Sequence, residues 1–170
     1  MNAKEPPSPE QGACTRGGHR YKASAQTKKA PPAAKRKKLP INPDKALLIR
    51  ADFADERAWK ALCAAMQAKV GDFQANVSPL SDRAYEGVTA KELVRLASPD
   101  DHFFVFVADR AALEDPEQAV LVVDLDEKPG RTFRVVPSEA WGIENNLSLA
   151  NMEFSEFAGA VDEAGVFRGF

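Results

Sequence analysis

A chain of 170 residues with 44% hydrophobic content has room for one ordinary globular domain. Only two cysteines occur, which argues against a disulfide framework, and the longest fully apolar run, residues 103–108, is too short to cross a bilayer. We therefore expect a cytoplasmic chain that does not associate with membranes.

The formal net charge of −2 conceals two unlike regions. Residues 1–45 carry eleven Lys or Arg against three acids, a net charge of +8, whereas residues 46–170 carry twelve against twenty-two, a net charge of −10. Residues 1–44 also contain almost no large aliphatic side chains, so they cannot bury enough surface to offset the entropy of folding. We predict a disordered basic tail over residues 1–44 and a single globular domain over residues 45–170.

The basic run AKRKKLP at residues 34–40 resembles a nuclear import signal or a patch that binds nucleic acid. Clustered cations bind phosphates favourably because they release counterions. No aromatic residues interleave with the run, and such runs also occur as plainly solvated tails. A solvated tail and a tail that binds nucleic acid or another polyanion both stay open.

The first half of the domain alternates strands and helices. Residues 46–49 form an apolar run that predicts a buried strand, and Asp55 is placed to cap a helix ending at Gly71. The alternation of apolar and polar residues over 73–77 predicts an edge strand that Pro79 closes. A capping box predicts a second helix to about residue 97. The helix after Asp55 carries an apolar stripe at helical spacing, formed by Trp59, Leu62, Cys63, Met66 and Val70.

The second half of the domain predicts further strands at residues 103–108, 119–125 and 132–136. The turn sequence KPG at residues 128–130 makes the last two strands an antiparallel hairpin. We expect an α/β fold, with α+β as the alternative. The sheet should be mixed and four- to five-stranded, with a C-terminal hairpin and with helices packed on its faces.

After the hairpin, apolar residues at i, i+3, i+4 and i+7 over residues 154–161 predict a helix. Either Asn151 or Glu153 could cap it. The alternation over residues 147–150 permits a short extended segment before this helix. We expect the C-terminus to dock on the domain, because Phe167 and Phe170 would otherwise be exposed.

Aspartates follow three of the predicted strands: Asp52, Asp109 and Asp124. Where strands run parallel their carboxyl ends converge, and converging carboxylates could bind Mg²⁺ and act on a phosphate ester. Aspartate at a strand end is also ordinary turn and cap chemistry, and the chain lacks a glycine-rich phosphate loop. We therefore predict no metal site and no cofactor, and keep a Mg²⁺-dependent hydrolase as an alternative.

Five other polar residues are candidates for binding: Asn145, Asn146, Asn151, Arg134 and Arg168. The asparagines could cap helix ends and tie loop backbone, or they could form a polar recognition surface. The arginines could pair with the acids of the domain or clamp a ligand.

Several segments of the domain form a recognisable set, together with the helix that carries Trp59: LLIRADF (47–53), HFFVFVAD (102–109), VLVVDL (120–125), FRVVPSEAW (133–141), IENNLSLANMEFSEFA (143–158) and GVFRGF (165–170). The most specific parts are ENNLSLANM and the FRGF ending. This set resembles a bacterial family described as domain of unknown function 6924, over about residues 46–170. The resemblance implies a single bacterial cytoplasmic domain and carries no activity, cofactor or catalytic residue.

The function that we favour is a non-enzymatic protein-interaction module whose acidic body binds another protein with a basic surface. An immunity-type domain that neutralises a basic toxin is one concrete form of it. The alternatives are the hydrolase that uses Asp52, Asp109 and Asp124, and nucleic-acid binding through the basic tail.

Overall fold

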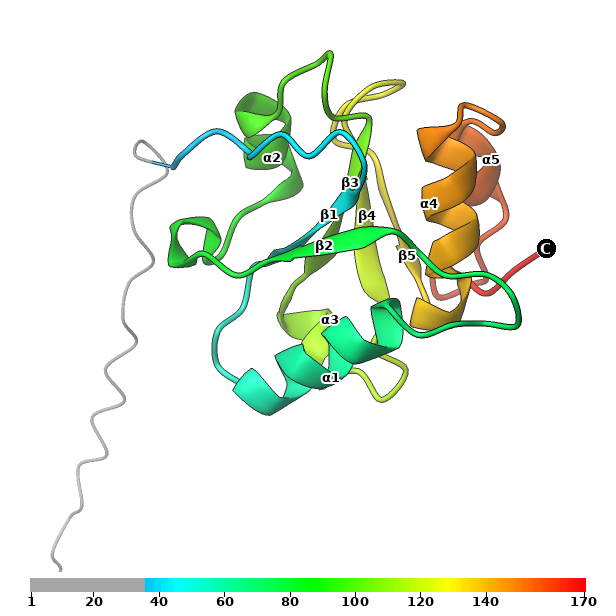
Figure 1. Cartoon of the computed structure of the whole chain (residues 1–170), viewed down its shortest axis with the longest axis horizontal. Helices are drawn as coiled ribbons and strands as arrows, with labels where there is room; N and C mark the ends of the chain where they lie inside the picture. Colours follow the sequence, from blue (N-terminus) through cyan, green and yellow to red (C-terminus); the bar gives the residue numbers. More distant parts are fainter. Residues whose placement is uncertain (1–35) are drawn as a thin grey trace, which may run out of the picture.

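The computed structural model describes residues 36–170 and shows one mixed sheet with helices on both faces (Figure 1). The α/β class is confirmed, but the sheet has six strands in the order β2-β1-β3-β4-β5-β6, so the expected four or five is wrong. The strands are β1 (Ala46–Arg50), β2 (Val77–Leu80), β3 (Phe104–Ala108), β4 (Val120–Asp124), β5 (Thr132–Val135) and β6 (Val166–Phe167).

Strand direction changes across this sheet. β1 pairs in parallel with β2 and β3, β3–β4 and β4–β5 are antiparallel, and β6 adds in parallel to β5. The predicted β4–β5 hairpin is confirmed, although β6 follows it at the sheet edge. We call the end where β1 and β3 finish the carboxyl end, and the end where they start, and where β4 finishes, the amino end.

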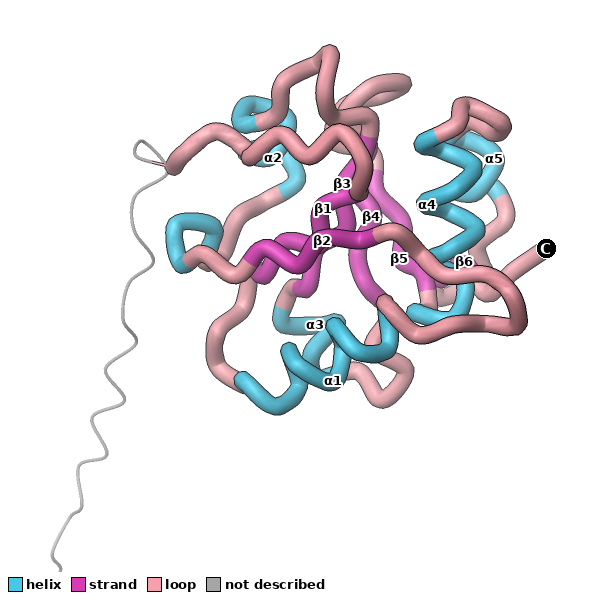
Figure 2. The backbone as a smooth tube through the Cα atoms, viewed as in Figure 1, coloured by secondary structure: helices cyan, strands magenta, loops and turns pink. Residues whose placement is uncertain are grey.

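The two faces of the sheet pack against different helices, as Figure 2 shows. One core contains side chains of α1, α3, α4 and α5, and the other contains side chains of α2 and the 3₁₀ turn η2. No helix within residues 36–170 combines the length and the apolar character needed to cross a membrane. The bounds are α1 (Glu56–Met66), η2 (Arg83–Tyr85), α2 (Ala90–Leu96), α3 (Arg110–Glu114), η3 (Pro137–Glu139), α4 (Ala140–Ser148) and α5 (Phe154–Gly159).

The predicted helix starts are confirmed. The Asp55 carboxylate accepts hydrogen bonds from the first-turn N–H groups of α1, and Thr89 forms a reciprocal capping box with Glu92 on α2. α1 ends at Met66, earlier than the predicted Gly71, because Gln67 leaves the helical conformation. After Gln67 the chain reverses direction, and an isolated antiparallel bridge joins Val70 and Phe73 on either side of Gly71.

Two predicted extended segments were wrong. β2 starts at Val77 and runs through Pro79, which the edge position tolerates because β2 pairs only with β1. Residues 147 and 148 belong to the last turn of α4, where Leu147 packs against the core. α5 then follows Glu153, whose N–H donates to the Glu156 carboxylate at 2.8 Å, so Glu153 and not Asn151 precedes the helix.

The C-terminus docks only in part. Phe167 is buried in the core, whereas Phe170 is 82% exposed, although its ring contacts those of Phe157 and Phe167. The expectation that both phenylalanines are covered is therefore correct for Phe167 and wrong for Phe170.

Residues 36–44 lie against the α2 face of the domain. Leu39 is buried, its N–H donates to the carbonyl of Leu96 at 3.0 Å, and the Tyr85 hydroxyl donates to the carbonyl of Lys38 at 2.9 Å. Residues 36–44, which precede the expected domain boundary, thus contact the domain. The prediction of disorder for residues 1–35 concerns residues outside the described part of the chain.

Candidate binding groove

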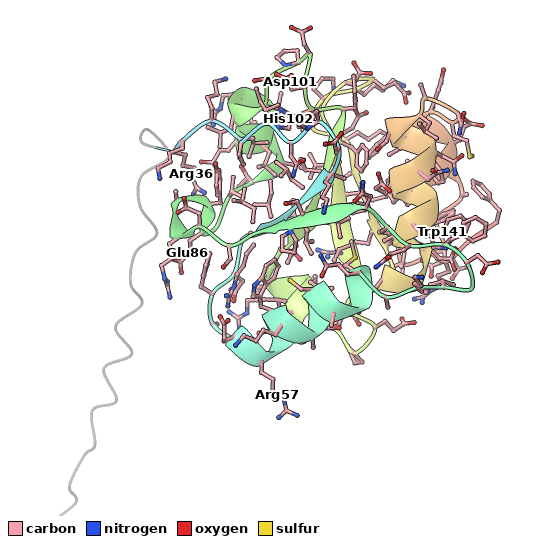
Figure 3. All side chains as sticks on the ribbon, in the orientation of Figure 1. Arg36, Arg57, Glu86, Asp101, His102 and Trp141 are labelled. Carbon is pink, nitrogen blue, oxygen red and sulfur yellow. The ribbon has the colours of Figure 1, made fainter. Side chains whose placement is uncertain are left out.

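Two adjoining hollows lie at the amino end of the sheet, with volumes of about 420 and about 120 Å³. They share Phe103, Phe104 and Ser148, so together they form one groove, which we call the amino-end groove. Figure 3 shows Asp101 and His102 at this end of the molecule, far from Arg57 on α1. The larger hollow is bounded by β3, the end of β4, the last turn of α4 and the start of α5.

The larger hollow has apolar walls that come from elements distant in the sequence. Phe103 precedes β3 and is 48% exposed, Leu147 lies in the last turn of α4, and Met152 lies in the loop before α5. Phe154, the first residue of α5, is buried with its ring centroid 4.9 Å from that of Phe133. An exposed aromatic ring beside buried ones provides a surface on which an apolar or cationic group can pack.

Acidic side chains surround these walls. The groove is lined by seven acids against one lysine, Lys45. Of the seven, only Glu127 forms an ion pair with another described residue, at 4.0 Å from Arg131. The acids are Asp44, Asp101, Asp124, Asp126, Glu127, Glu144 and Glu153.

Asp124 is one of two buried acids in the described chain, and it closes β4. Its carboxylate accepts hydrogen bonds from the N–H groups of Asp126 and Lys128, at 2.9 and 2.8 Å. These bonds shape the turn between β4 and β5. The donors are neutral backbone groups, so the negative charge is solvated by dipoles and is not balanced by a cation.

Glu144 is the other buried acid, in the middle of α4. Its carboxylate accepts from the Asn76 N–H at 3.0 Å and from the Ser148 hydroxyl at 3.1 Å, which ties α4 to the chain entering β2. Like Asp124, it forms no ion pair with any of residues 36–170. Both buried acids of the described chain therefore line this groove without an ion-pair partner among residues 36–170.

His102 also lines the groove and is buried. Its Nδ1 accepts from the Ser98 N–H at 3.2 Å, which assigns the proton to Nε2, and Nε2 donates to the Pro40 carbonyl at 3.2 Å. The ring thus holds the segment of residues 36–44 against the entrance to β3.

Two ion pairs lie at the carboxyl end of the sheet, Arg50 with Glu56 and Arg134 with Asp109. Arg50, buried at the end of β1, donates to Glu56 at 2.6 Å and to the carbonyl of Asp52 at 2.9 Å. Its guanidinium lies 4.5 Å from the ring centroid of Phe53 and 5.4 Å from that of Trp59. The hydrogen bond from Arg50 lowers the pKa of Glu56 below its ordinary value.

The three aspartates predicted to converge do not do so. Asp52 and Asp109 follow the parallel strands β1 and β3 at the carboxyl end, but Asp124 lies opposite Phe104 at the amino end, because β4 is antiparallel to β3. The Asp52 carboxylate accepts from the N–H of Ala54. No cluster of three or more His, Cys, Asp or Glu side chains suited to a metal ion occurs within residues 36–170.

The two candidate arginines form ion pairs within the domain. Arg134 donates to both carboxylate oxygens of Asp109, at 3.1 and 2.6 Å. Arg168 donates to Glu117 through two nitrogens and to Asp162 through Nε, which fastens the C-terminal segment to the turn before β4. Neither arginine lines the amino-end groove.

The candidate asparagines also lie outside the groove lining. The side-chain amide of Asn146 donates to the backbone carbonyl of Gly142 within α4. The backbone carbonyl of Asn146 accepts from the backbone N–H of Asn151. Asn145 and Asn151 are exposed on the surface beside α4. The structure thus does not gather the five predicted binding residues at one place.

Three described residues of the basic run also contact the domain. Arg36 lies 3.5 Å from Glu92, Lys37 lies 3.5 Å from Asp82, and Lys38 donates to the carbonyl of Arg95 at the end of α2. The remaining two residues of the run that precede Arg36 lie outside the described chain.

Sequence reasoning missed the residues that build the groove, Glu144 above all. Glu144 sits one position after Ile143 and four after Ala140, beside the apolar stripe of α4. An acid at the border of an apolar stripe is a signal for a buried carboxylate, but no helix was predicted over residues 140–148. The predicted strand begins at Phe103, whereas β3 begins one residue later.

The comparison with curated proteins found no match. The family model described as Domain of unknown function (DUF6924) matches residues 45–170, which is the whole of the sheet and all of its helices. By this match, the chain belongs to the domain of unknown function 6924 family.

Proposed function

We propose that the domain is a protein-interaction module that binds a basic segment of a partner protein in the amino-end groove. One observation carries this proposal: the two buried acids of the described chain, Asp124 and Glu144, both line the groove, and neither has an ion-pair partner among residues 36–170.

Burial of a charge without a counter-charge costs free energy, even where hydrogen bonds compensate part of the lost hydration. A cationic ligand in the groove recovers part of that cost, whereas an anionic ligand adds to it. The exposed acids Asp101 and Asp126 extend the same negative field to the groove mouth. A positively charged partner is therefore both attracted from solution and stabilised when bound.

The apolar walls indicate that the ligand also carries apolar groups. The larger hollow is lined in part by Phe103, Leu147 and Met152. A ligand that carries only positive charge, such as a polyamine, would leave this apolar surface without a partner. Interfaces draw most of their affinity from a few side chains that fill such hollows, with a polar rim around them. A peptide segment that mixes basic and apolar residues satisfies both features.

An immunity-type role, in which the domain neutralises a basic toxin, is one concrete form of this function. Residues 46–170 carry a net charge of −10, which speeds association with a basic protein. Association driven in this way weakens as the ionic strength rises.

The test is fluorescence anisotropy of a labelled peptide that alternates lysine with leucine, added to the full chain. We expect saturable binding that the double variant Asp101→Asn/Asp126→Asn weakens about five-fold, because each exposed ion pair contributes up to about 1 kcal/mol. The matched control Asp72→Asn/Glu163→Gln removes the same charge from exposed positions outside the groove lining.

Equal losses in the two double variants would show that only the overall charge matters and would refute the groove as the binding site. Binding that is indifferent to salt between low and physiological ionic strength would equally contradict a site built on exposed charge.

A further inference from the structure

Resting on the proposed function, we infer that the partner segment is anchored by an arginine side chain that fills the larger hollow. Its guanidinium lies on the exposed ring of Phe103 and faces the Asp126 carboxylate. Its aliphatic stem packs between Leu147 and Met152.

The apolar walls of the hollow and the acids at its mouth match the apolar stem and the charged head of an arginine side chain. The walls are apolar, each oxygen of the deep acid Asp124 already accepts from one backbone N–H, and the exposed acids lie at the mouth. Long basic side chains bury their methylene groups on apolar surface while the charged head stays near water. An anchor with an apolar stem and a terminal cation therefore fits better than a purely apolar one.

Among the mouth acids, Asp126 is the one placed to receive the cation. Glu127 accepts from the Ser155 N–H at 3.0 Å and lies 4.0 Å from Arg131, and Glu153 accepts from the Ser155 hydroxyl at 3.3 Å. The carboxylate of Asp126 is exposed and makes no hydrogen bond to any described residue. It can thus accept a new donor without breaking an existing bond.

The exposed ring of Phe103 selects arginine over lysine. A guanidinium is planar and weakly hydrated, so it stacks on an aromatic face more readily than a compact ammonium does. The domain contains the same kind of contact at the carboxyl end of the sheet, where the guanidinium carbons of Arg50 and Arg83 lie 4.5 and 4.8 Å from the ring centroid of Phe53.

The test uses the methionine methyl groups of the full chain as NMR reporters. The chain has three methionines, of which Met152 lines the hollow and Met66 is buried in the core beneath α1, so Met66 serves as an internal reference. A Met152→Leu variant assigns the reporter signal. The probe is N-acetylarginine N-methylamide, compared with the same derivatives of lysine and citrulline.

We expect the Met152 signal to shift saturably with the arginine probe, about three-fold more weakly with lysine, and not at all with the uncharged citrulline probe. Phe103→Leu should weaken arginine binding about two- to five-fold, since it keeps an apolar side chain but removes the ring. Asp126→Asn should weaken it by a similar factor, and the control Asp72→Asn should leave it unchanged.

Equal affinity for citrulline and arginine, or tighter binding of lysine, overturns the arginine anchor. So does a Met152 signal that none of the probes shifts. If the arginine probe fails while the arginine-free lysine–leucine peptide still binds in a groove-dependent way, only the anchor is refuted, whereas failure of both tests refutes the groove itself. If the arginine probe binds the Arg16→Gln/Arg20→Gln variant but not the unaltered chain, the anchor belongs to the chain's own N-terminal segment, which overturns the assignment to a partner.

Discussion

The two ends of the sheet place acidic residues in opposite electrostatic settings. At the carboxyl end, Asp109 is held by Arg134 and Glu56 by Arg50. At the amino end, Asp124 and Glu144 are buried with hydrogen bonds from neutral donors only. Charge type alone therefore does not mark a site: the paired acids hold elements of the fold together, whereas the two buried acids without an ion-pair partner among residues 36–170 leave room for a cation from outside the domain.

Replacement of an acid by its amide should change the free energy of unfolding in opposite directions at the two ends of the sheet. Removal of charge from a paired acid removes a stabilising interaction. Removal of charge from an unbalanced buried acid relieves a cost.

Asp109→Asn should lower the free energy of unfolding by about 2 kcal/mol, because the charge-assisted bonds from Arg134 are lost at a site only about a quarter exposed. Urea unfolding of the purified chain measures the change. The matched control is Glu114→Gln, which removes an exposed pair with Arg110 and should cost less than about 0.5 kcal/mol. Equal effects of the two variants would contradict the structural role of the Asp109 pair.

Glu144→Gln should raise the free energy of unfolding by about 1 kcal/mol, because the amide fills the same space without a buried charge. The amide oxygen can still accept from the Asn76 N–H, and the Ser148 hydroxyl can turn to accept from the amide nitrogen. The same variant should bind the lysine–leucine peptide more weakly. A loss of stability of more than about 1 kcal/mol would instead make Glu144 a structural tie like Asp109.

Acidification should weaken the ion pair between Glu56 and Arg50 at the carboxyl end of the sheet. The pKa of Glu56 is lowered from 4.5 in the folded chain by the hydrogen bond from Arg50. The stabilisation is therefore present at neutral pH and is lost as the pH falls below 4.5 through the folded-state pKa.

The difference in unfolding free energy between the unaltered chain and Glu56→Gln should accordingly shrink between pH 7 and pH 3, which urea titrations at each pH can measure. A difference that stays constant over this range would show that Glu56 does not contribute through its charge.

Asp126→Asn should change the free energy of unfolding by no more than about 0.5 kcal/mol, because this exposed carboxylate has no described partner to lose. Thermal unfolding beside the unaltered chain checks it. A small effect on stability together with weaker peptide binding separates a binding role from a structural one, and a large loss of stability would contradict the assignment to the groove mouth.

Local signals in the sequence predicted the elements whose cause is also local. The capping of α1 by Asp55 and of α2 by Thr89 and Glu92 needs only residues within one turn, and both were confirmed. The buried strands β1, β3 and β4 are continuous apolar runs that could be read directly. Trp59, Leu62 and Met66 of the apolar stripe are buried in the core, although Val70 of the same stripe is exposed.

Elements held by distant partners were misread. β6 has two residues, too few to carry a pattern, and exists because β5 offers a free edge to pair with. The alternation of Leu147 and Leu149 with small residues permitted an extended segment, yet Leu147 packs against the core in the last turn of α4. Glu144 became a groove residue only because its carboxylate meets the backbone of Asn76, 68 positions away.

Composition and neighbours along the chain are enough to predict the α/β class, the caps, the apolar strands and the surplus of acids over residues 46–170. The positions of those acids in space depend on the tertiary fold. Strand direction is set by pairing between distant segments, so the antiparallel run of β4 carries Asp124 away from Asp52 and Asp109 and places it beside Phe103 and Phe154.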